Sequence, residues 1–548
     1  MQWSSIATGA VRPGSCYHPP MSQSESIRST VVTRLAAIAA CVAVTFTSSL
    51  SLAQQDQVAE ANARYTSVPD SRRSDLILLP AVAKMDPPPA GLDGLKSAEL
   101  IDPGSRLWGD IEDWATASPQ QEALDALRSV TSESDIRRAM VFAQPYGTNG
   151  VDPELIRAGL YTELGDPPLL AGARIGYLKG LKNLLILVNV EATRLGASGK
   201  PGDAIDLMVR QVYLGRQIVD RSFLVESVFG FHSMINGLSR IRDIAYVDFR
   251  GDQVLSPEEI ARTIKAIDGT TNGYLNHGRI LFPNANKLAA EQLWELLYEP
   301  RGNVKASFAN TMARLRTSER PLRLFAEASR FESAGDQQGD WYETRDMIDS
   351  VFDGWSSRWT LNPFDRQLSL PYAYDDLDKQ KFSVISVSTG DMSILYNLRR
   401  VFDTEVVGTR DSLALLGYYY ELGEFPPAIS SVRPRWLDKI EADPFNPNRA
   451  VGRVPALEFF VPVRDDYVPD ETQSAQPHKM NVFSSTGENF SIMLREDQFV
   501  VYSVGRDGVK NLAEDVSVDP EAVTGDYLIW PPMLSLERMH LRETNRLP

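Results

Sequence analysis

The chain has 548 residues, which is enough for two to four domains and at least one large apolar core. Its 72 acidic residues outnumber its 56 basic residues and give a net charge of −16. Because nucleic acids are bound by clustered lysine and arginine side chains, this acidity and the lack of a basic stripe argue against a nucleic-acid partner.

The N-terminal region has the pattern of a cleaved export signal. Arg28 and Arg34 precede a short apolar run at residues 35–46, and small residues follow at 51–53. The run is too short to span a bilayer. We therefore expect a signal peptide over residues 1–53.

The same region contains both cysteines of the chain, Cys16 and Cys41. Their removal would leave no disulfide, thiol nucleophile or cysteine metal site. Residues 1–20 do not resemble the start of a signal, so we expect a mis-assigned extension and translation from Met21. A competing interpretation is a lipoprotein signal in which Cys41 carries the lipid. Both predict an exported protein of the bacterial periplasm or cell envelope, without a membrane span after signal removal.

Residues 54–100 are polar and then proline-rich, which predicts a disordered leader with one short apolar piece at 76–82. A helical domain is expected over 101–390, with helices from about residue 118. Three helix starts share a capping residue followed by proline, at Ser118-Pro119, Asp152-Pro153 and Ser256-Pro257.

The strongest helical signal lies between residues 169 and 300. Apolar side chains repeat every three or four residues over 178–195, 205–219 and 224–238, which predicts three helices. The short junction at 199–204 predicts antiparallel packing of the first two. This junction also resembles a tetratricopeptide hairpin, but a repeat array needs several units, so a helical bundle is the better interpretation.

A loop-like stretch from Asp248 to Glu259 invites comparison with a calcium-binding EF-hand. Arg250 stands where that loop needs an oxygen ligand, and Gln253 stands where it needs glycine. A capped helix start is therefore the better interpretation. Gly199-Lys200 likewise lacks the other residues of a phosphate-binding loop.

The remaining candidates are single residues or short acidic runs. Four histidines follow residue 53, and none is spaced from another as a helical metal-binding pair would be: His232, His277, His478 and His540. Trp108–Trp114 combines aromatic and carboxylate side chains, as sugar sites do, although a solvated helix face is the commoner explanation. No catalytic residue and no cofactor site are assigned.

Beyond residue 390 the pattern changes. An apolar stripe over 394–420 predicts one long helix ending at Gly423, and short apolar runs predict strands at 457–463, 490–494 and 499–504. Residues 495–498 are expected to join the last two strands as a hairpin. Residues 464–480 are expected to be a mobile insertion, and 333–342 and 362–376 are expected loops.

Four short motifs occur in a fixed order in this part of the chain. They are Tyr418 to Gly423-Glu-Phe425-Pro426, then Trp436-Leu437 with Asp443-Pro444-Phe445, then Tyr502-Ser-Val-Gly-Arg-Asp-Gly508, and finally Asp526 to Trp530. Over roughly 391–532 the chain thereby resembles the soluble domain of the type II secretion major pseudopilin and the closing region of a family of uncharacterised bacterial exported proteins. The expected fold is mainly α (a helical bundle or hairpins), with a pseudopilin-like α+β module over 391–548.

The resemblance also implies a calcium-binding loop, for which Asp507 and Asp526 match acidic positions. The loop itself differs from that of the family and keeps its acidic residues in another spacing, at Glu514, Asp515, Asp519 and Glu521. Calcium and a plain sheet-edge loop both remain open. A pseudopilin also begins with an apolar anchoring helix, and a polar segment, 375–381, stands there instead, so a pilus subunit is not expected.

The expected function is an exported structural or protein-interaction component of the envelope, with a protein partner favoured over a small molecule. One alternative is a hydrolase with a dispersed carboxylate site, and another is an accessory protein that contacts secretion pseudopilins. A deep cleft with convergent carboxylates and shifted pKa values would favour the hydrolase, whereas a flat apolar patch would favour the structural or interaction role.

Overall fold

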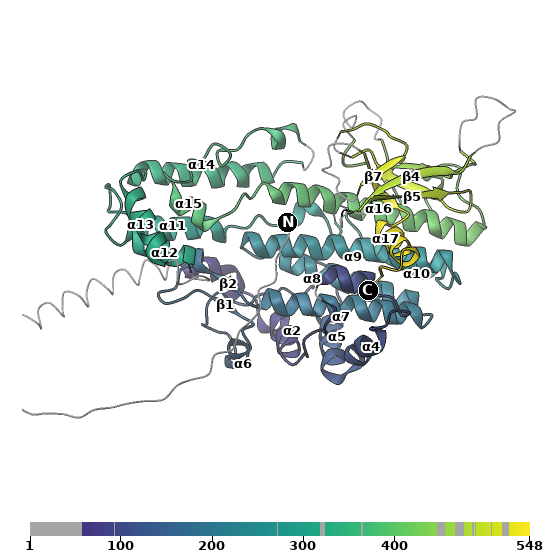
Figure 1. The fold of residues 1–548 in the computed structure, drawn as a ribbon, viewed down its shortest axis with the longest axis horizontal. Helices are drawn as coiled ribbons and strands as arrows, with labels where there is room; N and C mark the ends of the chain where they lie inside the picture. Colours follow the sequence, from purple (N-terminus) through teal and green to yellow (C-terminus); the bar gives the residue numbers. More distant parts are fainter. Residues whose placement is uncertain are drawn as a thin grey trace, which may run out of the picture. The chain divides into compact units, whose positions relative to one another are not determined.

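A computed structural model describes residues 57–547, except 93, 271, 318–323, 363–364, 447–454, 466–475, 485–486, 488, 506 and 518–524. All described residues belong to one compact unit, Ala53–Pro548. The described chain is mainly helical and carries a mixed β-sheet near its C-terminal end (Figure 1). The predicted signal peptide, with Cys16 and Cys41, lies outside the described residues.

Three long helices form where the apolar stripes predicted them: α7 (Tyr177–Ala197), α8 (Pro201–Val219) and α9 (Leu224–Arg250). α8 packs against both of the others, most closely against α9. Small residues allow this approach, since a Cβ added to Gly230 of α9 would lie 2.4 Å from the backbone nitrogen of Val219. The prediction of a helical bundle in this region is therefore confirmed.

Two of the three predicted helix caps are present. The Asp152 carboxylate accepts a hydrogen bond from the backbone N–H of Glu154 (2.8 Å) at the start of α6 (Pro153–Arg157). Ser256 and Glu259 form a reciprocal capping box at the start of α10 (Pro257–Ala266). The third prediction was wrong by one residue, because α5 (Ser118–Val130) already includes Ser118 and its capping position is Ala117.

The predicted disordered leader needs correction over its described part. Residues 57–66 are helical, and α2 (Asp75–Val82) and α3 (Leu95–Leu100) follow. α2 packs on α5 and α7, and its Leu78 and Leu79 are fully buried. The few apolar side chains of this stretch thus suffice because they complete the core of the bundle rather than forming one of their own.

The predicted helical region also contains shorter strands and further helices. They are β1 (Thr162–Glu163), β2 (Arg174–Ile175), α4 (Trp108–Thr116), α11 (Ala285–Leu297), α12 (Phe308–Thr317), α13 (Leu324–Gly335), α14 (Trp341–Trp359) and α15 (Ser383–Ser388). The expected loop at 333–342 is shorter than predicted, because Asp340 caps α14 by accepting hydrogen bonds from two backbone N–H groups. The expected loop at 362–376 includes a short 3₁₀ turn, Arg366–Ser369.

The long helix predicted before Gly423 is α16 (Ile394–Leu422), and Gly423 ends it in the left-handed conformation, with φ of 76°. α16 packs on α9 and α10 as well as on strands of the C-terminal sheet. A Cβ added to Gly408 would lie only 2.7 Å from the Ile529 side chain of that sheet. The helix therefore belongs to both parts, and the predicted border at 390/391 does not separate two cores.

The C-terminal sheet has six described strands in the order β3-β6-β8-β7-β4-β5. β7 runs parallel to both of its neighbours, and the other pairings are antiparallel. A last helix, α17 (Met533–Glu543), follows β8 and packs on α9. The strands are β3 (Glu458–Phe460), β4 (His478–Phe483), β5 (Asn489–Leu494), β6 (Val500–Ser503), β7 (Asp515–Ser517) and β8 (Asp526–Trp530).

The predicted hairpin across 495–498 was wrong. β5 pairs with β4, and β6 pairs with β3 and β8. All four residues of β6 are buried, as expected for a central strand, whereas β5 alternates between exposed and less exposed residues and lies at the sheet edge. β4 also begins inside the segment predicted to be a mobile insertion, 464–480, of which 466–475 lie outside the described residues.

The motifs that follow α16 form a corner against the helix and the sheet. The Trp436 ring packs so closely on α16 that a Cβ on Gly417 would lie 2.5 Å from it. The buried Asp443 carboxylate accepts hydrogen bonds from the Ser503 hydroxyl (2.7 Å) and from the backbone N–H groups of Phe445 (3.0 Å) and Val504 (3.2 Å). Two motifs distant in sequence are thereby joined, and we call these contacts the Asp443 junction.

Candidate functional site: an apolar groove beside a buried charge cluster

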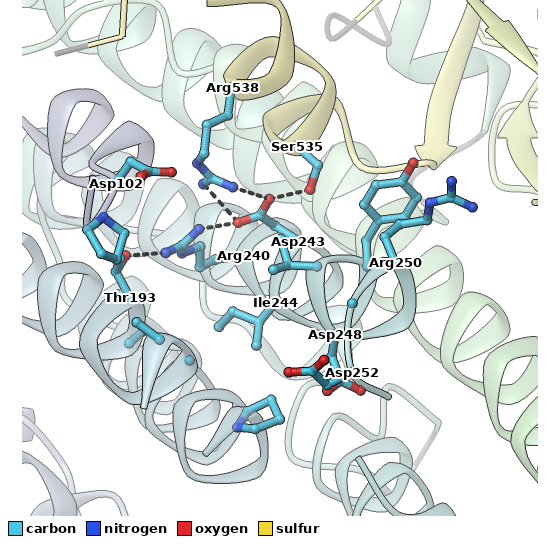
Figure 2. Close-up of a pocket in the computed structure, with 18 of the residues that line it drawn as sticks. Asp102, Thr193, Arg240, Asp243, Ile244, Asp248, Arg250, Asp252, Ser535 and Arg538 are labelled. Atoms are coloured by element: carbon cyan, nitrogen blue, oxygen red, sulfur yellow. Dashed lines mark hydrogen bonds and ion pairs between the residues drawn. The ribbon is translucent and has the colours of Figure 1, made fainter. Parts of the chain in front are cut away.

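A groove of about 480 Å³ opens between the C-terminal part of α7, the second half of α9, α17 and residues 101–103 (Figure 2). Its volume lies within the range of small-molecule and side-chain pockets, about 300–1,000 Å³. Residues from near both ends of the described chain meet in this groove. No pattern in the sequence predicted that they would.

Four side chains at one end of the groove form a cluster that we call the charge cluster: Arg240, Asp243, Ser535 and Arg538. Arg538 of α17 binds Asp243 of α9 with two parallel contacts of 2.9 and 3.0 Å. Arg240 and Ser535 bind the same carboxylate (Figure 2). Arg240 also donates to the Thr193 hydroxyl at 2.6 Å, which ties α7 to α9. The charge cluster therefore holds three helices together.

Electrostatics fix the protonation state of this cluster. Burial opposes ionisation of Asp243, but the guanidinium groups of Arg538 and Arg240 outweigh it and lower the pKa of Asp243 to about 2. A carboxylate that stays ionised at neutral pH and is bound by three neighbours is a poor proton donor or base. The cluster is suited to a structural role.

The mouth of the groove is apolar and open to solvent. Val247 of α9, Val254 of the following loop and Met539 of α17 all line it, and 55%, 51% and 45% of their surfaces are exposed. Ile244, labelled in Figure 2, lies deeper in the same groove and is buried. Three exposed apolar side chains from separate elements thus converge on one concave surface.

The charged rim is mostly paired within the protein. Arg542 pairs with Asp102, and Arg250 pairs with Asp497 at 2.7 Å. Asp252 is exposed and has no hydrogen-bond or ion-pair partner in the described part of the chain. One carboxylate at the edge of the groove is therefore free to meet a cation.

The stretch compared with an EF-hand contributes to this rim, and the structure confirms the capped-helix interpretation. The Asp248 carboxylate accepts hydrogen bonds from the backbone N–H groups of Val254 (2.8 Å) and Leu255 (3.1 Å). Its second oxygen also accepts the Tyr420 hydroxyl at 3.1 Å. Both carboxylate oxygens of Asp248 are therefore used to hold the loop that leads into α10, and a metal ion would have needed the same oxygens.

The four histidines lie apart. His232 is exposed on α9, and His478 at the start of β4 lies 3.2 Å from the carbonyl oxygen of Ala513. His540 stacks on the ring of Phe490. His277 has a carboxylate partner, since its Nδ1 lies 2.9 Å from Asp403 at a separate cleft of about 640 Å³.

The aromatic and acidic stretch at 108–114 forms part of α4. Ile111 and Trp114 face the core, while Asp110 and Asp113 are exposed. The solvated-face interpretation is therefore confirmed, and no groove formed by these carboxylates accompanies it among the described cavities.

The calcium expectation rests on residues that already have other partners. Asp526 is buried, which raises its pKa to about 6, and its carboxylate accepts the backbone N–H of Ala513 at 2.7 Å. Asp507 accepts the backbone N–H of Val509 at 2.9 Å. Asp519 and Glu521 lie outside the described residues, and among the residues that the structure describes no three potential metal ligands come together. Calcium binding stays a prediction.

No helix in the described ranges is both long enough and apolar enough to cross a membrane. Comparison with known proteins adds no identity: no family model matches the chain, and neither a curated protein nor a solved structure is similar enough to be matched.

Proposed function

We propose that this chain is an exported protein of the bacterial periplasm or cell envelope that binds another protein through the groove between α7, α9 and α17. The observation that supports this proposal is the convergence of Val247, Val254 and Met539, each about half exposed, on one concave surface. Exposed apolar clusters of this kind are typical of interaction sites because covering them removes apolar surface from water.

The rim indicates the chemistry of the partner. Asp252 is the carboxylate beside the apolar mouth that has no partner in the described structure, and the chain as a whole carries a net charge of −16. A complementary segment would place apolar side chains in the groove and a lysine or arginine next to Asp252. The charged groups of the charge cluster are paired with one another, so we expect the cluster to hold the groove in shape and not to form an ion pair with the partner.

A crosslinking experiment tests the groove directly. We expect a photoreactive amino acid at position 254 to crosslink one envelope protein in intact cells, because Val254 is 51% exposed at the mouth. The matched control is position 370, where Leu370 is 56% exposed on another part of the surface and lines none of the described cavities. The same protein should not be captured there.

Substitutions then measure the strength of the contact. We expect Val247→Asp to weaken binding of the crosslinked protein at least about tenfold, because it places a charge in the apolar contact. Asp252→Lys should slow association, and more strongly at low salt. The proposal fails if position 370 captures the same protein as position 254, or if Val247→Asp binds that protein like the wild type.

Export has its own test. We expect the mature protein purified from the envelope or periplasmic fraction to begin at Gln54, because the small residues at 51–53 fit a signal-peptidase site. Edman or mass-spectrometric sequencing of the N-terminus gives the answer. A mature chain that begins well before Gln54 would contradict cleavage here, and a lipid on Cys41 would support the lipoprotein alternative.

The crosslinked protein also decides the accessory-protein alternative, since a pseudopilin at position 254 would place the chain beside a secretion filament. A hydrolase would need a different site, because the carboxylate of the charge cluster is fixed in its ionised form.

A further inference from the structure

A second cavity, of about 320 Å³, uses another face of α9. It is bounded by α3, α9, α16, β8 and the start of α17. Its volume is near the lower end of the range for small-molecule sites, about 300–1,000 Å³. A ligand of monosaccharide size matches that space.

Three of the four charged groups that line this cavity, Lys96, Arg242 and Glu405, have an ion-pair partner. Lys96 contacts Glu537 at 2.6 Å. Arg242 of α9 contacts Glu405 of α16 at 2.8 Å. Glu405 also accepts a hydrogen bond from the Tyr527 hydroxyl of β8. These pairs leave Glu99 as the charged group of this lining without an ion-pair partner in the described structure.

Three polar side chains of the lining have no hydrogen-bond partner in the described structure: Glu99, Asn236 and Ser239. Glu99 is 9% exposed, although a carboxyl group so deeply buried normally has partners. Asn236 and Ser239 lie one helical turn apart on α9, so both can contact the same ligand. A carboxyl, an amide and a hydroxyl are therefore free at one small cavity.

We propose that this cavity binds an uncharged carbohydrate residue. Sugar hydroxyl groups both donate and accept hydrogen bonds, which satisfies a carboxyl, an amide and a hydroxyl together. The apolar lining by Ile235, Leu528 and Met533 suits the C–H face of a sugar ring. Lys96, Arg242 and Glu405 are already paired, and Glu99 is only partly ionised near neutral pH, so an ammonium or carboxylate ligand would gain less than a neutral one.

The environment of Glu99 supports a ligand of this kind. Burial raises the pKa of Glu99 to about 7, against the opposing effect of Lys96, Arg240 and Arg538 and with a smaller increase from Asp243. Near neutral pH the carboxyl therefore exists both as a hydrogen-bond donor and as an acceptor. Hydroxyl groups can bind either form, so we expect sugar affinity to change little between about pH 6 and 8, whereas an amine would bind better as the pH rises.

Saturation-transfer NMR on the full mature chain tests the proposal, with glucose and N-acetylglucosamine as neutral probes and glucosamine and glucuronate as charged ones. We expect saturable binding of at least one neutral sugar and weaker binding of the charged probes. Ser239→Leu fills the cavity and should weaken that binding at least about tenfold, and Asn236→Ala should weaken it by a smaller factor. Ser129→Leu is the matched control, because Ser129 is exposed on α5 and lines no described cavity.

Thermal unfolding of each variant shows whether it is folded. If Ser239→Leu does not fold, the binding of sugars by Asn236→Ala tests the proposal instead. The proposal is overturned if neither neutral sugar binds saturably. It is also overturned if the charged probes bind as tightly as the neutral ones, or if the folded cavity variants bind like the wild type. None of these results depends on the partner of the groove.

Discussion

Replacing Asp243 by alanine is expected to lower the free energy of unfolding by about 3–5 kcal/mol, which is the usual cost of removing one partner from a buried ion pair. Asp243 is 0% exposed, and Arg240 and Arg538 are 4% and 9% exposed. Without the carboxylate, two buried guanidinium groups would repel each other, and α17 would lose its main polar contact with α9. Urea unfolding followed by circular dichroism measures the effect.

Two further variants separate the explanation from its alternatives. Asp252→Ala removes an unpaired, exposed carboxylate of the same groove and should change stability by less than about 0.5 kcal/mol. The triple change Asp243→Leu, Arg240→Met and Arg538→Met should recover much of the loss, because it removes the uncompensated charges together. If Asp243→Ala costs less than about 1 kcal/mol, the charge cluster does not hold the helices as inferred.

The pKa of Asp243 gives this prediction a pH dependence with a definite sign. Its folded-state pKa, about 2, lies below the usual value of 3.8, so the folded state binds fewer protons than the unfolded chain in that interval. The ionised carboxylate therefore contributes fully above about pH 4, and its contribution of roughly 2 kcal/mol is lost as the pH falls through 2. The difference between wild type and Asp243→Asn should shrink over that acid range.

The helices could be predicted where a local pattern was sufficient. The apolar stripes of α7, α8 and α9 and the glycine after α16 need no knowledge of distant residues. The hairpin prediction was wrong because strand pairing depends on distant residues. β5 pairs with β4, and β4 begins in a polar segment that gave no strand signal. A nearly continuous apolar run at 499–504 did carry a usable signal, because a strand that is buried on both faces reads in this way.

Neither cavity could have been predicted, because each is assembled from elements separated by hundreds of residues. Arg538 and Asp243, for example, are 295 positions apart. One signal was nevertheless present within α9. Arg242 continues the apolar stripe of Phe231, Ile235 and Leu238, so a charged side chain is placed on a buried helix face and requires a carboxylate. The sequence indicates that need, but not that Glu405 meets it.

The Asp443 junction carries the second large expected effect. Asp443→Ala should lower the free energy of unfolding by about 3 kcal/mol or more, because hydrogen bonds to a charged group contribute about 1.5–3 kcal/mol each and their buried donors would be left unpaired. The donors are the Ser503 hydroxyl and the backbone N–H groups of Phe445 and Val504. Urea unfolding gives the global cost, and amide hydrogen exchange at Val504 gives the local one.

Asp443→Asn is the conservative control, since its amide oxygen still accepts hydrogen bonds and its loss should be clearly smaller. Asp438→Ala removes an exposed carboxylate from the same corner and should change stability by less than about 0.5 kcal/mol. If Asp443→Ala behaves like Asp438→Ala, the packing of Trp436 on Gly417 must hold the corner alone. The expected result would instead show that two motifs 60 residues apart fold as one unit because a single carboxylate joins them.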